Sequence, residues 1–106
     1  MSTHTQSCEI AIAKVLSPNL ALRDTASEFF DEIDALGCIE VTIDFDNVET
    51  ITRSFAHEYL SRKRITAKNT VEKNVPLSVH KMFAAIENSN NKPRFEELRS
   101  VQVINI

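Results

Sequence analysis

A change of hydrophobic period at Gly37, the only glycine in the chain, constrains the fold more than any other feature. Before Gly37, apolar residues repeat with the period of one helix face, at Leu22, Ala26, Phe29, Phe30, Ile33 and Leu36. After it, they alternate with polar residues as in a strand that buries one face, at Ile39, Val41, Ile43 and Phe45. The chain is therefore expected to form a helix from near residue 20, a left-handed turn at Gly37 and a strand, which together indicate an α/β fold.

The sequence on either side of this unit predicts further strands and helices. An imperfect alternation predicts a first strand within residues 8–16, and Ser17 or Asn19 is expected to cap the helix that follows. A strand is expected somewhere between residues 65 and 73. Thr52 is placed to cap a second helix, whose apolar face carries Phe55, Ala56, Tyr59 and Leu60.

The last third of the chain predicts a third helix and a terminal strand. Pro76 suits the first turn of a helix that runs to about Asn88, with apolar residues at Val79, Met82, Phe83 and Ile86. Residues 88–93 are rich in asparagine and end in a proline, which predicts a loop. A short helix over residues 94–100 and a strand over residues 101–106 are expected to follow.

The length and composition fit one domain. The chain has 106 residues, of which 42% are hydrophobic, so it can fold around a single core. No apolar run can span a bilayer, and residues 1–7, expected to form a flexible arm, lack the features of a signal peptide. We therefore expect a cytoplasmic protein without membrane contacts. In that compartment Cys8 and Cys38 are expected to stay reduced, and they lie too far apart in the chain for a zinc-binding pair.

The net charge of −3 conceals opposite charges in the two halves of the chain. Residues 1–50 carry ten acidic and two basic side chains, whereas residues 51–106 carry ten basic and five acidic ones. Such an asymmetry can orient a protein partner or a second copy, or it can reflect two solvated helix faces. Nucleic-acid binding is not expected, because the protein is acidic overall and its basic residues have few aromatic neighbours.

The sequence lacks the usual motifs for catalysis and cofactor binding. A chain with one glycine cannot form the glycine-rich loops that hold nucleotide phosphates. His57 and Glu58 resemble the start of a zinc-protease motif, but Ser61 stands where its second histidine belongs. Asp44 and Asp46 could hold a magnesium ion with a substrate phosphate, although a solvated turn explains them better. Hence no catalytic residue, metal site or cofactor is assigned.

Residues 43–54, IDFDNVETITRS, resemble the core of the STAS domain family, named from sulfate transporters and anti-sigma factor antagonists. In that family a strand leads through a short loop to Ile-Asp-Ser-Ser-Gly at the start of a helix. Ile51 matches its isoleucine and Thr52 its aspartate, while Arg53 and Ser54 match its two serines. In bacterial anti-sigma factor antagonists a partner kinase phosphorylates the second serine, so the resemblance makes Ser54 the phosphorylation candidate. Phe55 replaces the glycine and departs from the pattern.

The chain is still more similar to the STAS-like domain of unknown function found in small bacterial proteins, sometimes beside histidine-kinase-type ATPases. Ser17, Leu20, Arg23 and Ala26 match the first helix of that family, and residues 71–83 resemble its later strand, turn and helix. The resemblance implies a mixed sheet of four to five strands with helices mainly on one face. It also implies a non-enzymatic regulatory module whose partner is a histidine-kinase-like ATPase or an anti-sigma factor.

The predicted helix start at Thr52 provides a separate physical argument for Ser54. If Thr52 caps the helix, Ser54 lies in its first turn, where free N–H groups and the helix dipole favour an anion. Arg53 is unusual at such a position. It can face an acidic partner or a phosphate, or it can pair with Glu49 or Asp46 in the adjoining loop.

Docking of a protein partner is therefore expected at Thr52, Arg53, Ser54 and Phe55, together with Arg23. The alternative is a small enzyme, or a binder of a phosphate-bearing ligand, that uses Arg23, Asp44, Arg53 and Ser54. A deep pocket among those side chains would favour the alternative, whereas a flat or convex surface would favour docking. The sequence leaves the oligomeric state open.

Overall fold

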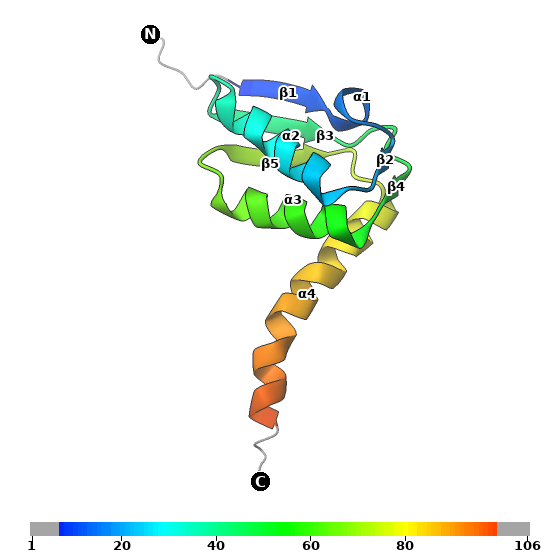
Figure 1. Cartoon of the computed structure of the whole chain (residues 1–106), viewed down its shortest axis with the longest axis vertical. Coiled ribbons are helices and arrows are strands. Elements are labelled where there is room, and N and C mark those ends of the chain that lie inside the picture. Colours follow the sequence, from blue (N-terminus) through cyan, green and yellow to red (C-terminus); the bar gives the residue numbers. More distant parts are fainter. Residues whose placement is uncertain (1–6, 100–106) are drawn as a thin grey trace.

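A computed structural model describes the backbone of residues 7–99 and the side chains of residues 7–88 (Figure 1). Its elements are β1 (Ser7–Ala11), α1 (Ile12–Val15), β2 (Asn19–Leu20), α2 (Arg23–Ala35), β3 (Glu40–Asp44), β4 (Thr50–Ile51), α3 (Arg53–Ile65), β5 (Asn69–Lys73) and α4 (Leu77–Arg99). The predicted α/β class is confirmed. The expected strand over residues 101–106 lies outside the described residues, as does the expected flexible arm apart from Ser7, which begins β1.

Two parallel sheets take the place of the expected mixed sheet. β1, β3 and β5 pair in that order, with Val41 of β3 opposite Cys8 of β1 and Thr70 of β5. β2 and β4 form a separate short pair. Among the described residues the sheets are parallel and not mixed, because each connection between paired strands includes a helix that brings the chain back, so that the next strand runs in the same direction.

Helices α2 and α3 cover one face of the three-stranded sheet, and no helix of the described part of the chain covers its other face (Figure 1). Because the strand order never reverses, right-handed crossovers place both helices on the same side. On the covered face Val41 and Ile43 are fully buried, as their alternation predicts. On the open face Glu9 of β1 and Lys73 of β5 form an ion pair of 2.7 Å. These polar side chains explain how a parallel sheet can stand with one uncovered face.

The core lies between the sheet and helices α2, α3 and α4. The ring of Phe30 in α2 packs edge-to-face on Tyr59 in α3, with 5.1 Å between the ring centroids. Phe83 of α4 stacks on the same tyrosine at 5.2 Å. The apolar stripes predicted for the three helices therefore meet in one aromatic cluster, and Phe30 and Tyr59 at its centre are fully buried.

The region between β1 and α2 differs from its prediction. The strand expected within residues 8–16 ends at Ala11, and the short helix α1 follows it. Helix α2 begins at Arg23, not near residue 20, because Asn19 and Leu20 form β2. The expected cap is also wrong: the side chain of Ser17 accepts a hydrogen bond from the N–H of Asn19, and α2 starts without a side-chain cap.

The connection after α2 does not contain the expected left-handed glycine. Leu36 ends the helix in an extended conformation, and its carbonyl accepts a hydrogen bond from Nζ of Lys68 at 2.6 Å. Positive φ values occur instead at Asn47 and Asn74, in the turns after β3 and β5. Asparagine tolerates this conformation better than most residues do, so no glycine is needed in either turn.

Helix α4 is longer than predicted. It begins at Leu77, close to the expected start, but it continues through residues 88–93, where a loop is expected, to Arg99. Asparagine and serine disfavour a helix only weakly, so a helix already formed over residues 77–88 can continue through them, whereas Pro93 lacks one intrahelical N–H donor and is the costly residue of this segment. Figure 1 shows the later part of α4 extending away from the sheet. No helix among the described residues is long and apolar enough to cross a membrane.

Cys8 and Cys38 form a disulfide, so the expectation of two reduced thiols is wrong for this structure. Cys8 belongs to β1, and Cys38 lies two residues before β3, which pairs with β1. Strand pairing brings their Cα atoms to 6.1 Å although 30 residues separate them in the chain. The bond ties the edge strand β1 to the segment that enters the central strand.

Candidate functional site

The short pair of β2 and β4 brings the starts of α2 and α3 together. Leu20 of β2 lies opposite Ile51 of β4, and each strand leads almost directly into its helix. The N–H of Thr52 donates to the carbonyl of Leu20 at 2.9 Å, and its hydroxyl donates to the carbonyl of Ala21 at 2.6 Å. The first turns of two helices therefore lie side by side at one end of the molecule (Figure 1).

Thr52 caps α3, as the sequence predicts. Its Oγ1 accepts a hydrogen bond of 3.2 Å from the N–H of Phe55, and its own backbone is extended. Because the same hydroxyl also donates to Ala21, its hydrogen bonds are made within the chain. Thr52 therefore positions the first turn of α3 and does not offer a free hydroxyl to a partner.

Arg53, Ser54 and Arg23 are exposed at this site, as is Thr52. Arg53 and Ser54 are the first two residues of α3, and Arg23 is the first residue of α2. The ion pairs among the described side chains include neither arginine, so the alternative pairing of Arg53 with Glu49 or Asp46 is not observed there. Two guanidinium groups and two helix N-termini contribute positive charge to this surface, and Asp24 in the first turn of α2 offsets part of it. Such a surface favours acidic side chains or phosphate.

Phe55 lies in the core, although it is one of the residues predicted to dock. Its side chain is fully buried, and its ring stacks against Tyr59 with 6.4 Å between centroids. Helical spacing places it on the same face as Tyr59, four residues later, which is also buried. Phe55 therefore cannot contact a partner directly, and the exposed residues of the predicted site are Arg23, Thr52, Arg53 and Ser54.

Asp44 belongs to a turn and does not join the two arginines. Its Oδ1 accepts hydrogen bonds from the N–H of Asp46 at 2.9 Å and from Nδ2 of Asn74 at 3.0 Å. These two bonds lower the pKa of Asp44 below its usual value of 3.8. Among the described residues, no group of three or more metal-ligating side chains is present. The carboxylate thus links the turn after β3 to the turn after β5.

Four hollows on the described surface are lined by other residues. The largest, about 240 Å³, lies before α2 and is lined by Leu16, Ser17, Asn19, Leu20, Ala21, Leu22 and Thr25. Two lie between α3 and α4 around Leu60 and Lys63, and one lies between β1 and α2. None of these four is lined by Arg23, Asp44, Arg53 or Ser54. These four hollows therefore do not bring the two arginines, Asp44 and Ser54 around one cavity.

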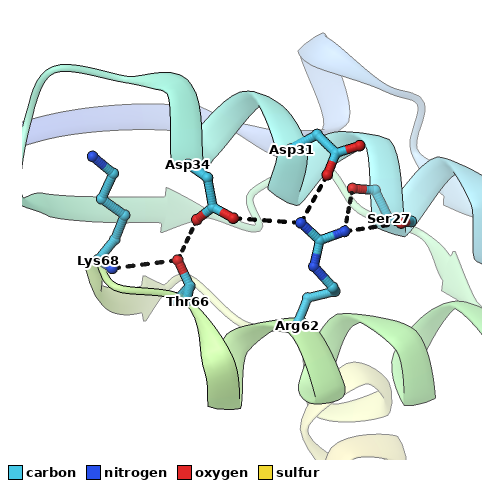
Figure 2. Close-up of polar contacts among 6 residues, drawn as sticks. All are labelled: Ser27, Asp31, Asp34, Arg62, Thr66 and Lys68. Carbon is cyan, nitrogen blue, oxygen red and sulfur yellow. Dashed lines mark hydrogen bonds and ion pairs between the residues drawn. The ribbon is translucent and has the colours of Figure 1, made fainter.

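A group of residues that the sequence does not single out joins α2 to α3 (Figure 2). Nη1 of Arg62 donates to the carbonyl and the hydroxyl oxygen of Ser27, both at 2.9 Å. Its Nη2 donates to Asp31 at 2.8 Å and to Asp34 at 3.4 Å, and the hydroxyl of Thr66 also donates to Asp34. Two acidic side chains of the first half of the chain, Asp31 and Asp34, therefore form ion pairs with Arg62 of the second half.

A second such group surrounds the buried phenol of Tyr59. The hydroxyl donates to Oε2 of Glu72 at 2.8 Å, and Nζ of Lys63 pairs with Oε1 of the same carboxylate at 2.9 Å. Burial raises the pKa of Tyr59 well above its usual value of 10, so the hydroxyl remains a donor. The hydrogen bond to Glu72 thus satisfies the buried hydroxyl of Tyr59. The sequence of β5 alone does not predict that the side chain of Glu72 points toward α3.

Comparisons with known proteins identify no relative. No family model, curated protein or solved structure matches the chain. The similarity to STAS-like domains therefore rests on the residues around the start of α3 and on the weaker matches elsewhere in the sequence.

Proposed function

We propose that this chain is a non-enzymatic regulatory module that binds a protein partner through the exposed start of α3. The observation that carries the proposal is the arrangement of the first turn: Thr52 is used as an internal cap, whereas Arg53 and Ser54 are exposed beside Arg23. A side chain in this position can change its charge without disturbing the core beneath it. The resemblance to anti-sigma factor antagonists supports Ser54 as the residue that is phosphorylated.

Phosphorylation of Ser54 would act on the partner surface more than on the fold. A phosphate adds about two negative charges. The helix N-terminus and Arg53 can neutralise part of that charge locally, because free N–H groups and a cation both favour an anion there. The outward surface would nevertheless change from positive toward negative. A partner with acidic side chains at its interface would then bind less tightly.

The partner class and the cellular location follow from the resemblance. Histidine-kinase-like ATPases and anti-sigma factors are the partners of the family that the motif resembles, and an ATPase would also supply the phosphate. Such a partner places the protein in the cytoplasm. The bond between Cys8 and Cys38 would then be exposed to reducing thiols, so the reduced form is the one expected to bind.

A small enzyme or a binder of a phosphate-bearing ligand has less support. That alternative needs Arg23, Asp44, Arg53 and Ser54 around one ligand, whereas Asp44 is engaged by Asp46 and Asn74. The four hollows described above do not include these side chains.

A binding and phosphorylation experiment tests the proposal. Histidine-kinase-like ATPases from the same genome are mixed with the purified protein, and affinity is measured by calorimetry before and after addition of magnesium ATP. We expect one ATPase to bind, Arg53→Glu to weaken binding at least about tenfold, and the phosphate to be located on Ser54 by mass spectrometry. Binding that is insensitive to Arg53→Glu, together with phosphate on other residues or on none, contradicts the proposal.

A further inference from the structure

The outer edge of β1 (Ser7–Ala11) offers hydrogen-bonding groups to another strand. Within residues 7–99, β3 is the only strand that pairs with β1, which forms the outermost strand of its sheet (Figure 1). Half of the backbone groups of such a strand point outward. Native proteins commonly block exposed edges with prolines or lysines, but β1 contains neither.

An apolar hollow of about 110 Å³ lies beside this edge, between β1, α1 and α2. Its lining consists of Ile10, Val15, Phe29, Glu32, Ile33 and Leu36. Val15 is 50% exposed at the rim. Because Ile10 points from β1 toward the helix-covered side, a strand added beside β1 would place every second side chain over the hollow. A hollow of this size receives one or two side chains, not the row of anchors that a bound helix inserts.

Carboxylates border the hollow along α2. Glu32 lines it, and Glu28 lies one turn earlier on the same side of the helix; both are exposed. The ion pairs of the described side chains involve Asp31 and Asp34, which face Arg62 of α3, and do not involve either glutamate. The edge therefore combines apolar surface with negative charge that favours a cationic occupant.

A second copy of this chain fits the edge poorly. Pairing of two β1 strands would bring no basic residue of β1 to the junction, because Ser7–Ala11 contains none and its Glu9 already pairs with Lys73. It would also place the Glu28 and Glu32 side chains of both copies near the same junction. Like charges across a strand pair are destabilising, so a partner with the opposite charge is favoured.

We propose that the outer edge of β1 binds an extended segment of a partner protein, with apolar residues over the hollow and flanking Lys or Arg residues facing Glu28 and Glu32. Backbone hydrogen bonds to β1 supply affinity, while the hollow and the two carboxylates supply specificity. This surface is distinct from the start of α3, so its occupant can bind whether or not Ser54 is modified.

A peptide titration tests this proposal. The probe is the capped peptide Lys-Thr-Val-Thr-Val-Thr-Lys, added to the isotope-labelled full chain and followed by NMR. We expect chemical-shift changes centred on β1, Val15 and Phe29. The variant Glu28→Lys/Glu32→Lys should bind the peptide at least about tenfold more weakly. Glu49→Lys/Glu87→Lys changes the net charge equally at exposed positions elsewhere, and it should bind like the wild type.

A second peptide separates strand addition from simple apolar contact. It carries the same side chains but is methylated on every backbone nitrogen between the two lysines, which removes the hydrogen bonds that it would donate to β1 and hinders close approach of the two backbones. It should bind at least about tenfold more weakly than the first peptide. The proposal is overturned by equal binding of the two peptides, by equal binding to the two double variants, by shifts centred on β5, or by no binding. Self-association of the free protein that Val15→Lys abolishes would assign the edge to a second copy and would also overturn it.

Discussion

Single side chains in this protein hold segments that are distant in the sequence. Thr52 does so with one hydroxyl, which caps α3 and also donates to Ala21 before α2. Phe30 does so by packing, since its ring lies against Tyr59 of the neighbouring helix. The first interaction fixes where the exposed residues Arg53 and Ser54 lie, and the second holds the two helices on the sheet.

Phe30→Ala should be strongly destabilising. Its side chain is fully buried, and truncation removes the contact with Tyr59 and leaves a cavity. We expect the free energy of unfolding to fall by about 3–5 kcal/mol, measured by urea denaturation. Ile65→Ala, at a side chain that is 75% exposed, is the control and should change it by less than about 0.5 kcal/mol. Similar small effects of the two substitutions would show that the helix stripe is not core.

Asp44 should make stability depend on pH in the acid range. Hydrogen bonds from Asp46 and Asn74 hold its pKa below the usual 3.8 in the folded state. The ionised group therefore stabilises the fold above that value, and this contribution is lost as the pH falls through the lowered pKa. Asp44→Asn keeps an acceptor oxygen but removes the charge. Urea denaturation should show a wild-type advantage at neutral pH that shrinks below about pH 4. An advantage that is constant from neutral to acid pH contradicts this assignment.

Residue-level prediction from sequence succeeds where the cause is local. Thr52 could be identified as a cap because capping depends on three neighbouring residues, and the burial of Phe55 follows from helical spacing. The bond between Cys8 and Cys38 and the contact of Asp44 with Asn74 depend on which strands are neighbours. That information is absent from the local pattern. The family motif nevertheless predicts Phe55 at the docking surface, because a motif gives the position of a residue and not the direction of its side chain.

At the level of elements, α2 and α3 are joined through Arg62, and β1 is joined to the segment before β3 through a disulfide. The first link is a planar guanidinium that contacts Ser27 and Asp31 together (Figure 2). The second is a covalent bond across parallel neighbours. Each link joins two elements, so a substitution can remove the link without changing the helix or strand that it connects.

Arg62→Lys should weaken the contact between α2 and α3 despite keeping the charge. A lysine cannot donate to Ser27 and Asp31 at once, because it lacks the fork of the guanidinium. We expect a loss of about 1–2 kcal/mol in the free energy of unfolding, mainly from the partly buried bonds to Ser27. Arg64→Lys, at an exposed position in the same turn, is the matched control and should be nearly neutral. Equal effects at the two positions would mean that the guanidinium fork contributes nothing specific.

Removal of the disulfide should lower stability without abolishing the fold. The bond closes a segment of 30 residues, for which chain entropy predicts about 3–4 kcal/mol. The oxidised wild type should therefore melt well above Cys8→Ala/Cys38→Ala. A reducing agent should bring the wild type close to the variant and leave the variant unchanged. Two freely titrating thiols in the air-oxidised protein would contradict the bond.

Element-level prediction fails where partners decide the structure. The helix stripe of α2 and the alternation of β3 were predictable because each is periodic over many residues. β2 and β4 have two residues each and are strands only because they pair with each other, so no local hydrophobic pattern predicts them. The continuation of α4 through residues 88–93 overrides the turn preference of those residues.

At the scale of the whole molecule, the strand order β1-β3-β5 determines which surfaces are free. Both crossovers place their helices on the same face, so within residues 7–99 no helix crossover covers the opposite face and no further strand pairs with β1 or β5 at the sheet edges. The same order aligns the starts of α2 and α3 at one end, where Arg23, Arg53 and Ser54 are exposed. The α/β class could be predicted from sequence, but the all-parallel pairing could not, because it depends on the connections between distant strands.

The central claim is that charge at Ser54 controls partner binding and not folding. Ser78 is the best control, because it is exposed and is the second residue of α4, as Ser54 is of α3. Ser61 lies on the same helix as Ser54, but it is half-buried and would test packing as well as charge. The comparison of Ser54→Asp with Ser78→Asp therefore isolates the position of the charge.

The decisive measurement is the affinity of these two variants for the ATPase partner, with thermal stability recorded in parallel. Both variants should unfold within about 1 kcal/mol of the wild type, the usual range for charges at helix ends. Ser54→Asp should bind the ATPase at least about tenfold more weakly, a change of about 1.4 kcal/mol, while Ser78→Asp should bind like the wild type. Equal losses for the two variants, or wild-type affinity for Ser54→Asp, would contradict the claim.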